Sequence, residues 1–204
     1  MAEQRTQVVW FKRDLRVYDH ACLTGAAGKG PVLAMLVVEP EYWALPETSW
    51  RQFELLYQAI ASLKEQLRAI GGTLLVWTGD AVSALEALHD ELGPFDLWAH
   101  QETGNFWTFQ RDVLVREWCA SRSIPFNEPV QYGVWRGSRL NRDRWAKDWD
   151  ALMSQPILER PDEIVWSQAA PRGFAPDLPT DKQLGLKPDG IEGIQPGGRD
   201  AALA

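Results

Sequence analysis

The sequence predicts an α/β protein with a Rossmann-like, doubly wound sheet of five parallel strands, in the order 3-2-1-4-5, with helices on both faces. Two observations support this class. Short apolar runs alternate with helical patterns from residue 7 to residue 127. The runs are nearly continuous in apolar residues, which is typical of parallel strands covered on both faces. Because crossovers between parallel strands are right-handed, successive helices are expected on both sides of the sheet.

Each expected strand is a short run rich in β-branched, aliphatic or aromatic residues. The runs cover residues 7–11, 32–38, 73–77, 95–99 and 125–127.

The longest expected helix covers residues 49–70. Ser49 is a suitable N-cap and the Gly71-Gly72 pair a stop signal. Its apolar residues follow the 3.6-residue period of one helix face. They are Phe53, Leu56, Ile60, Leu63, Leu67 and Ile70.

Three further helices are expected between the strands, at residues 20–27, 80–92 and 105–122. Asp80 is the expected N-cap of the second, which ends at Gly93-Pro94. In the third, Trp107, Leu114 and Trp118 are the expected inward residues.

The alternation of expected strands and helices ends at about residue 133, and the composition changes after it. We expect an α/β domain over 1–133, an additional helix packed on it within 134–154 (residues 139–153), and a Pro/Gly-rich linker over 155–198. The linker carries scattered apolar residues, Ile164, Val165, Trp166 and Phe174, which are expected to contact a second domain. Residues 199–204 are expected to start a further helix.

Charge and composition exclude several classes. The net charge of -7 makes the chain a poor ligand for nucleic acid. Its N-terminus has no signal-peptide pattern, and no run approaches the roughly 20 apolar residues of a membrane helix, so we expect a cytoplasmic protein without a membrane partner. Cys22 and Cys119 lie far apart, without a Cys-x-x-Cys motif or a Cys/His cluster, so neither a zinc site nor a disulfide framework is predicted. His20, His89 and His100 have no evident catalytic partners in the sequence.

Ligands of doubly wound sheets bind beyond the carboxyl ends of the strands, and three motifs lie there or open the helices that follow. The first strand leads into Trp10-Phe11-Lys12-Arg13-Asp14-Leu15-Arg16. Ser49-Trp50-Arg51-Gln52-Phe53 opens the long helix. Arg51 lies beside free helix N–H groups, where a cation is mildly unfavourable, so we expect an anionic partner for it. The fourth strand leads into His100-Gln101-Glu102-Thr103-Gly104-Asn105, followed by Arg111-Asp112. Charged residues after a buried strand are ion-paired, solvent-facing or ligand-facing.

These motifs resemble those of the photolyase/cryptochrome family. The first is similar to the family's W-F-R-x-D-L-R opening, with Lys12 in place of Arg, and the second to its S-x-R-x-x-F helix. The chain end, Pro196-Gly197-Gly198-Arg199-Asp200, resembles the exit of the family's linker into its flavin domain. The resemblance therefore implies an N-terminal α/β domain without the C-terminal FAD-binding domain.

In relatives with a light-harvesting antenna, the loop after the fourth strand lines the antenna pocket. The resemblance points to seven cofactor-binding candidates: Arg13, Val38, Arg51, Glu102, Gly104, Asn105 and Trp107. Folate-binding relatives carry an Asn-Glu pair where this chain has Trp107-Thr108, which favours a flavin or deazaflavin over folate. The alternative is that Trp107 fills the pocket and excludes an antenna.

The resemblance implies a docking or antenna domain of a blue-light-dependent DNA photolyase, which is a pyrimidine-dimer lyase, or of a cryptochrome photoreceptor. The implied partners are the FAD-binding domain and, for the full-length protein only, UV-damaged DNA. No catalytic residue is assigned and the domain alone is expected to be inactive, because FAD belongs to the C-terminal domain. A stand-alone nucleotide-binding α/β domain and an interaction module with an empty pocket remain the alternatives.

Overall fold

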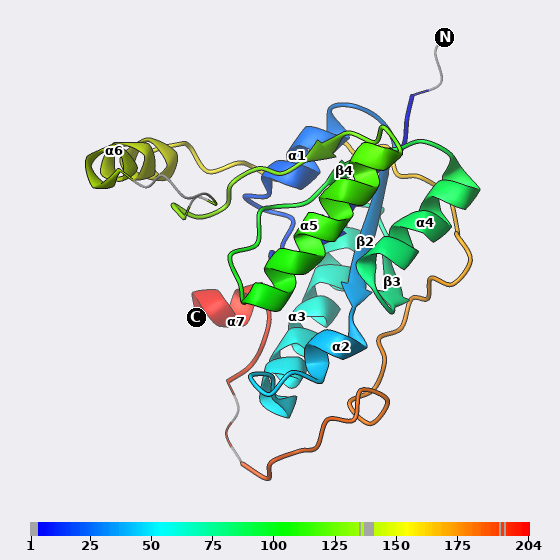
Figure 1. Ribbon diagram of the computed structural model, residues 1–204, viewed down its shortest axis with the longest axis vertical. Coiled ribbons are helices and arrows are strands. Elements are labelled where there is room, and N and C mark those ends of the chain that lie inside the picture. The colour runs from blue at the N-terminus through cyan, green and yellow to red at the C-terminus, as the bar shows by residue number, and fades with distance from the viewer. Residues whose placement is uncertain (1–3, 135, 137–140, 192, 194) are drawn as a thin grey trace.

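A computed structural model describes residues 4–134, 136, 141–191, 193 and 195–204. Its five strands form one parallel sheet in the order β3-β2-β1-β4-β5, which confirms the predicted topology (Figure 1). The strands are β1 (Gln7–Phe11), β2 (Val32–Val38), β3 (Leu74–Thr78), β4 (Asp96–Trp98) and β5 (Phe126–Asn127).

Helices cover both faces of the sheet. One face packs against α1 (Ala21–Ala27) and α3 (Trp50–Arg68), and the other against α4 (Ala81–Leu92) and α5 (Phe106–Ser121). Successive residues of β1 alternate between the two cores, with Val9 on the first face and Trp10 on the second, because side chains alternate along a strand.

The helices start where the capping residues predict. Ser49 and Gln52 form a reciprocal capping box at α3. Asp80 accepts from the Ser83 N–H at α4, and Asn105 accepts from the Thr108 N–H at α5. The apolar stripe of α3 faces the core as predicted, with Leu56 and Ile70 at its partly buried margins.

Two local predictions are wrong. The loop expected after β2 contains a short helix, α2 (Pro40–Trp43), which begins at Pro40 because proline suits a first helical turn. Leu114 was expected to face inward, but its side chain is 57% exposed. The inward face of α5 instead carries the polar Thr108 and Asp112 together with apolar residues, because this helix closes over charged side chains.

Residues 164–175, the edge segment, pack on this same sheet. Ser167 N–H donates to the Val32 carbonyl at 2.8 Å, and Ala175 exchanges two 2.9 Å backbone hydrogen bonds with Val76. The Trp166 indole lies so close to Gly72 that a Cβ there would meet it at 2.5 Å. Trp166 packs on the α3 end and Phe174 on Trp77, and the expectation that these partly buried residues also contact a second domain stays a prediction.

The last two helices are α6 (Arg142–Met153) and α7 (Arg199–Leu203). Figure 1 shows α6 standing away from the sheet, and Trp145 Nε1 donates to the Gly133 carbonyl at 2.8 Å. Residues 139 and 140, where this helix was expected to start, lie outside the described residues. Before α7, Gly197 N–H donates to Gln58 of α3 at 2.7 Å. The predicted division into domain, packed helix, linker and truncated helix stays a prediction.

Candidate functional site

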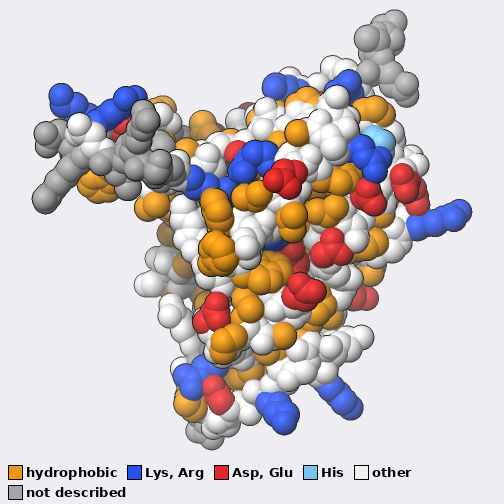
Figure 2. Space-filling view, in the orientation of Figure 1, with side chains coloured by type: hydrophobic (Ala, Val, Ile, Leu, Met, Phe, Trp, Pro, Cys, Tyr) orange, Lys and Arg blue, Asp and Glu red, His pale blue; other side chains and the backbone are white. Residues whose placement is uncertain are grey.

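A cavity of about 310 Å³ opens at the carboxyl ends of β1 and β2, between α3 and α5. Its aromatic lining comes from Trp10, Tyr42 and Trp43. Its charged lining is Lys12, Arg13, Glu39, Glu102 and Arg111. Figure 2 shows apolar and acidic side chains side by side over α2 and the start of α5. Aromatic walls with a few convergent polar groups are typical of small-molecule sites.

Arg111 is the centre of the charged lining. Its Nη1 lies 2.9 Å from Glu39 Oε2, and its Nη2 lies 2.5 Å from Glu102 Oε2 and 2.8 Å from Asp112 Oδ1. The guanidinium also lies 4.8 Å from the Trp10 ring centroid. Three carboxylates and one aromatic face therefore hold this side chain in place.

Asp112 and Lys12 form a buried ion pair behind Arg111. Lys12 Nζ lies 3.1 Å from Asp112 Oδ2, and Arg136 contacts the same carboxylate oxygen. Burial alone would raise the pKa of Asp112, but Lys12 and Arg111 hold that pKa at about 2. Burial lowers the pKa of Lys12 despite the attraction of Asp112. Asp112 is thus a fixed negative charge under the floor of the cavity.

Glu39 is the unusual group of the lining. Burial raises the pKa of Glu39 to about 7, although Arg111 acts in the opposite direction. Its Oε2 is bound by Arg111, whereas its buried Oε1 has no hydrogen-bond partner. A buried polar atom without a partner is costly, so in the ionised form of Glu39 this oxygen can accept a hydrogen bond from a ligand.

Two of the predicted site residues meet at the cavity. Arg13 Nε lies 2.8 Å from Glu102 Oε1, and both side chains line it. Gly104 lines a neighbouring polar pocket of about 210 Å³ together with Asp14 and His100.

Four predicted residues lie elsewhere. Asn105 caps α5 and donates to Glu47 at 2.9 Å. The Trp107 ring packs 5.6 Å from the Tyr42 ring and lines a smaller cavity of about 170 Å³. Val38 belongs to the core that α1 and α3 cover. Its neighbour Val37 points to the other face of β2 and lines the cavity instead. Arg51 pairs with Asp189 at the surface, so its anionic partner comes from the chain itself.

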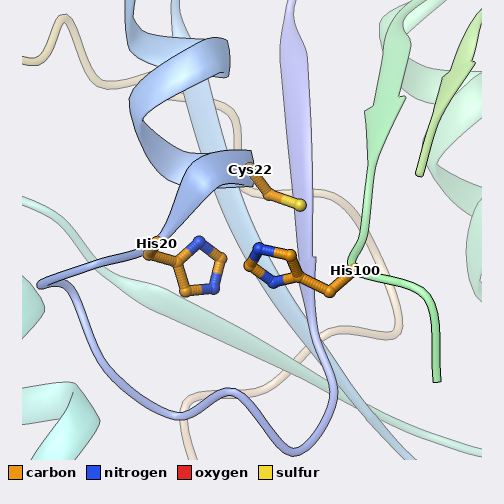
Figure 3. Close-up of side chains that lie close together, drawn as sticks. All are labelled: His20, Cys22 and His100. Carbon is orange, nitrogen blue, oxygen red and sulfur yellow. The ribbon is translucent and has the colours of Figure 1, made fainter. Parts of the chain in front are cut away.

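The structure also corrects the interpretation of the histidines and Cys22. His100 Nδ1 lies 2.5 Å and His20 Nε2 lies 2.9 Å from Asp14 Oδ2. His20, Cys22 and His100 form a buried cluster (Figure 3). The expectations of no Cys/His cluster and of no partners for these two histidines are therefore wrong. The tertiary fold joins His100 to residues about 80 positions earlier, so spacing in the sequence could not show the cluster.

Sequence reasoning also missed Glu39 and gave Arg111 no role at the cavity. Glu39 follows directly on the apolar run 32–38. A carboxylate at the end of a buried parallel strand is the signal that could have found it, because ligands bind at that edge of the sheet.

A five-stranded parallel sheet with helices on both faces, and a cavity at the carboxyl ends of its strands, defines this as a doubly wound α/β domain. The family model described as DNA photolyase matches residues 7–140, and the chain belongs to this family. Within the part of the chain that the structure describes, no helix is long and apolar enough to cross a bilayer.

Known relatives include photolyases and cryptochromes. The cryptochrome DASH of Gloeobacter violaceus is 31% identical over 133 residues, which cover 62% of this chain and 26% of the relative. The structure of the Synechocystis cryptochrome matches with a TM-score of 0.75 and 19% identity, covering 100% of this chain and 46% of that chain.

An archaeal photolyase from Sulfolobus tokodaii, solved with two FAD molecules and described as implying a novel light-harvesting cofactor, matches with a TM-score of 0.62 and 16% identity. That match covers 79% of this chain and 38% of the archaeal chain. The chain spans about a quarter of the length of the curated relatives it matches.

Proposed function

We propose that the chain is the antenna and docking domain of a photolyase or cryptochrome, and that the cavity between α3 and α5 holds a flavin or deazaflavin chromophore. The observation that carries the proposal is Glu39, which lines the aromatic cavity of about 310 Å³ and whose buried Oε1 has no hydrogen-bond partner. That volume lies at the lower end of the range for small-molecule pockets. The second FAD of the archaeal photolyase is a precedent for a flavin antenna in this family.

The polar groups of the cavity favour one kind of ligand edge. Because Arg111 occupies Glu39 Oε2, only Oε1 is left to accept a hydrogen bond. A pterin presents two adjacent donors, which suit a free carboxylate with both oxygens available. The imide N–H of a flavin or deazaflavin is a single donor flanked by carbonyls, and it matches one free oxygen beside an arginine.

Arg13 and Glu102 contribute to the mouth of the same cavity. The Arg13 side chain is about half exposed and donates to Tyr42 Oη at 2.5 Å, whereas Glu102 is nearly buried. We assign Arg13 to the polar tail of the chromophore and Glu102 to holding Arg13 and Arg111. Trp107 leaves this cavity open, because its ring packs 5.6 Å from that of Tyr42 and lines the smaller cavity instead.

The same proposal assigns partners and activity. The FAD-binding domain of the family would cover the cavity, and UV-damaged DNA would be a ligand of the full-length protein alone. The chain itself carries no repair activity, because the electron donor of repair is the FAD of the other domain. Turnover of pyrimidine dimers by this chain under blue light would contradict this assignment.

A titration of the purified chain with FMN, a 5-deazaflavin and a reduced folate tests the ligand, with flavin fluorescence and difference absorption as readouts. We expect saturable binding of FMN or the deazaflavin. Glu39→Gln should weaken it about tenfold or more, the cost of a hydrogen bond to a charged group. Arg51→Gln is the matched control, since its partner Asp189 lies outside the cavity. Tight AMP or ATP binding without flavin binding would instead support a nucleotide-binding domain.

A further inference from the structure

A second group of chemically reactive side chains lies beside the cavity. His20 precedes α1, Cys22 lies in its first turn, and His100 follows β4. Figure 3 shows the Cys22 sulfur near the His100 ring and the two imidazoles next to each other, with ring centroids 4.6 Å apart in an edge-on arrangement. One ring nitrogen of each histidine and the Cys22 sulfur lie within 4.8 Å of one another, and all three side chains are buried. A thiol and two imidazoles in one place form a ligand set for a transition metal.

The Asp14 carboxylate lies next to one ring nitrogen of each imidazole and orients both rings. His100 Nδ1 lies 2.5 Å from Asp14 Oδ2, and His20 Nε2 lies 2.9 Å from the same carboxylate oxygen, which can only accept a proton, without the alignment of a hydrogen bond. Asp14 Oδ1 accepts from the Lys12 N–H at 2.8 Å, so the carboxylate is itself held in place. The ring protons therefore belong on the nitrogens next to Asp14, which leaves lone pairs on His100 Nε2 and His20 Nδ1. A carboxylate behind a histidine is the usual support of a metal-binding imidazole.

These contacts leave three donor atoms for one cation. In a tetrahedral site the ligand atoms are about 3.3–3.6 Å apart, so the cluster must contract on binding. His20 Nδ1 accepts from the Leu23 N–H at 3.0 Å, and the cation would replace that hydrogen bond. The neighbouring pocket of about 210 Å³ is lined by Asp14 and His100, which offers a route of entry to the cluster.

We propose that His20, Cys22 and His100 bind one Zn²⁺ ion, with Asp14 behind the two imidazoles. One sulfur and two nitrogens suit Zn²⁺, whereas Mg²⁺ and Ca²⁺ prefer oxygen ligands. Binding converts the Cys22 thiol to a thiolate and releases its proton to solvent, without any redox change. None of these four side chains lines the chromophore cavity.

A Co²⁺ titration of the purified, chelator-treated chain tests the proposal, because Co²⁺ bound to a thiolate gives a charge-transfer band in the near ultraviolet. We expect this band with one equivalent of Co²⁺, its removal by Zn²⁺, and its loss in Cys22→Ala. Cys119→Ala is the matched control, since Cys119 is the other buried free thiol and should leave the band unchanged. Asp14→Asn should weaken Zn²⁺ binding about 10–100-fold.

X-ray absorption on the Zn²⁺-loaded wild-type chain needs no variant. We expect one sulfur at about 2.3 Å and two imidazole nitrogens at about 2.0–2.1 Å. A folded wild-type chain without the thiolate band, a band that persists in Cys22→Ala or disappears in Cys119→Ala, or a zinc shell without sulfur would each overturn the proposal.

Discussion

Arg111 Nη1 lies 2.9 Å from Glu39 Oε2, and this pair joins α5 to the carboxyl end of β2 at the floor of the cavity. The contact occupies one oxygen of Glu39 and leaves the other without a partner. The attraction of Arg111 offsets part of the cost of burying the Glu39 carboxylate, and the unpartnered oxygen keeps its hydrogen-bonding capacity for a ligand.

The buried position of Glu39 predicts a pH-dependent stability. Its pKa is raised from 4.5 to about 7, first by burial, so the folded state holds the proton more tightly than the unfolded chain. The stabilising contribution of protonation is complete below about pH 4.5 and is lost as the pH rises through about 7. At about 1.4 kcal/mol per pKa unit, the change is on the order of 3–4 kcal/mol.

Urea unfolding of the wild type and of Glu39→Gln at pH 4.5, 6 and 8 measures this effect. The free energy of unfolding of the wild type should fall relative to that of the variant as the pH rises, because the amide side chain of the variant cannot ionise. A constant difference between the two proteins across this range would show that Glu39 does not titrate as described.

The ion pair of Lys12 and Asp112 predicts a large loss of stability on substitution. Asp112 is fully buried, and Asp112→Asn leaves the ammonium of Lys12 without its charged partner. We expect the free energy of unfolding to fall by about 3–5 kcal/mol. Chemical denaturation at neutral pH measures it.

The control is the exposed pair of Arg122 and Glu86, 2.6 Å apart at the surface. Arg122→Gln should cost at most about 1 kcal/mol. Equal losses of unfolding free energy in Asp112→Asn and Arg122→Gln would mean that the buried ion pair stabilises the fold no more than an exposed one.

The edge segment predicts that Trp166 stabilises the α/β sheet. Its indole packs on Gly71 and Gly72 and donates to the Ile70 carbonyl at 2.7 Å. Trp166→Ala should lower the free energy of unfolding by about 2–4 kcal/mol, since the side chain is partly buried. Its neighbour Val165 is 69% exposed, so Val165→Ala should change stability by about 0.5 kcal/mol or less. If Trp166→Ala behaves like Val165→Ala, the edge segment does not clamp the sheet in solution.

Most of the fold could be predicted from periodicity and capping. The stripe of α3 and the caps Ser49, Asp80 and Asn105 are local signals, and the structure follows them closely. Leu114 was misplaced because α5 turns the polar Asp112 inward, which a rule that buries only apolar residues does not allow. The contacts of the edge segment with the sheet could not be predicted, because composition shows that Trp166 needs a partner but not which partner.

The candidate site was less predictable, because it depends on contacts between distant residues. Arg13 and Glu102 were found from loops at the carboxyl ends of two strands, and the fold brings them together. Val38 was misassigned by one position, since only the alternation of β2 decides that Val37 faces the cavity. The partner of Arg51 is 138 positions away, beyond the reach of any local pattern.

A crystal structure of the chain soaked with FMN or a 5-deazaflavin tests the central claim most directly. We predict that the tricyclic ring occupies the cavity between α3 and α5, with a ring N–H about 2.7–3.2 Å from Glu39 Oε1. A ring bound elsewhere, or one inside the cavity that leaves Glu39 Oε1 without a donor, would contradict the account.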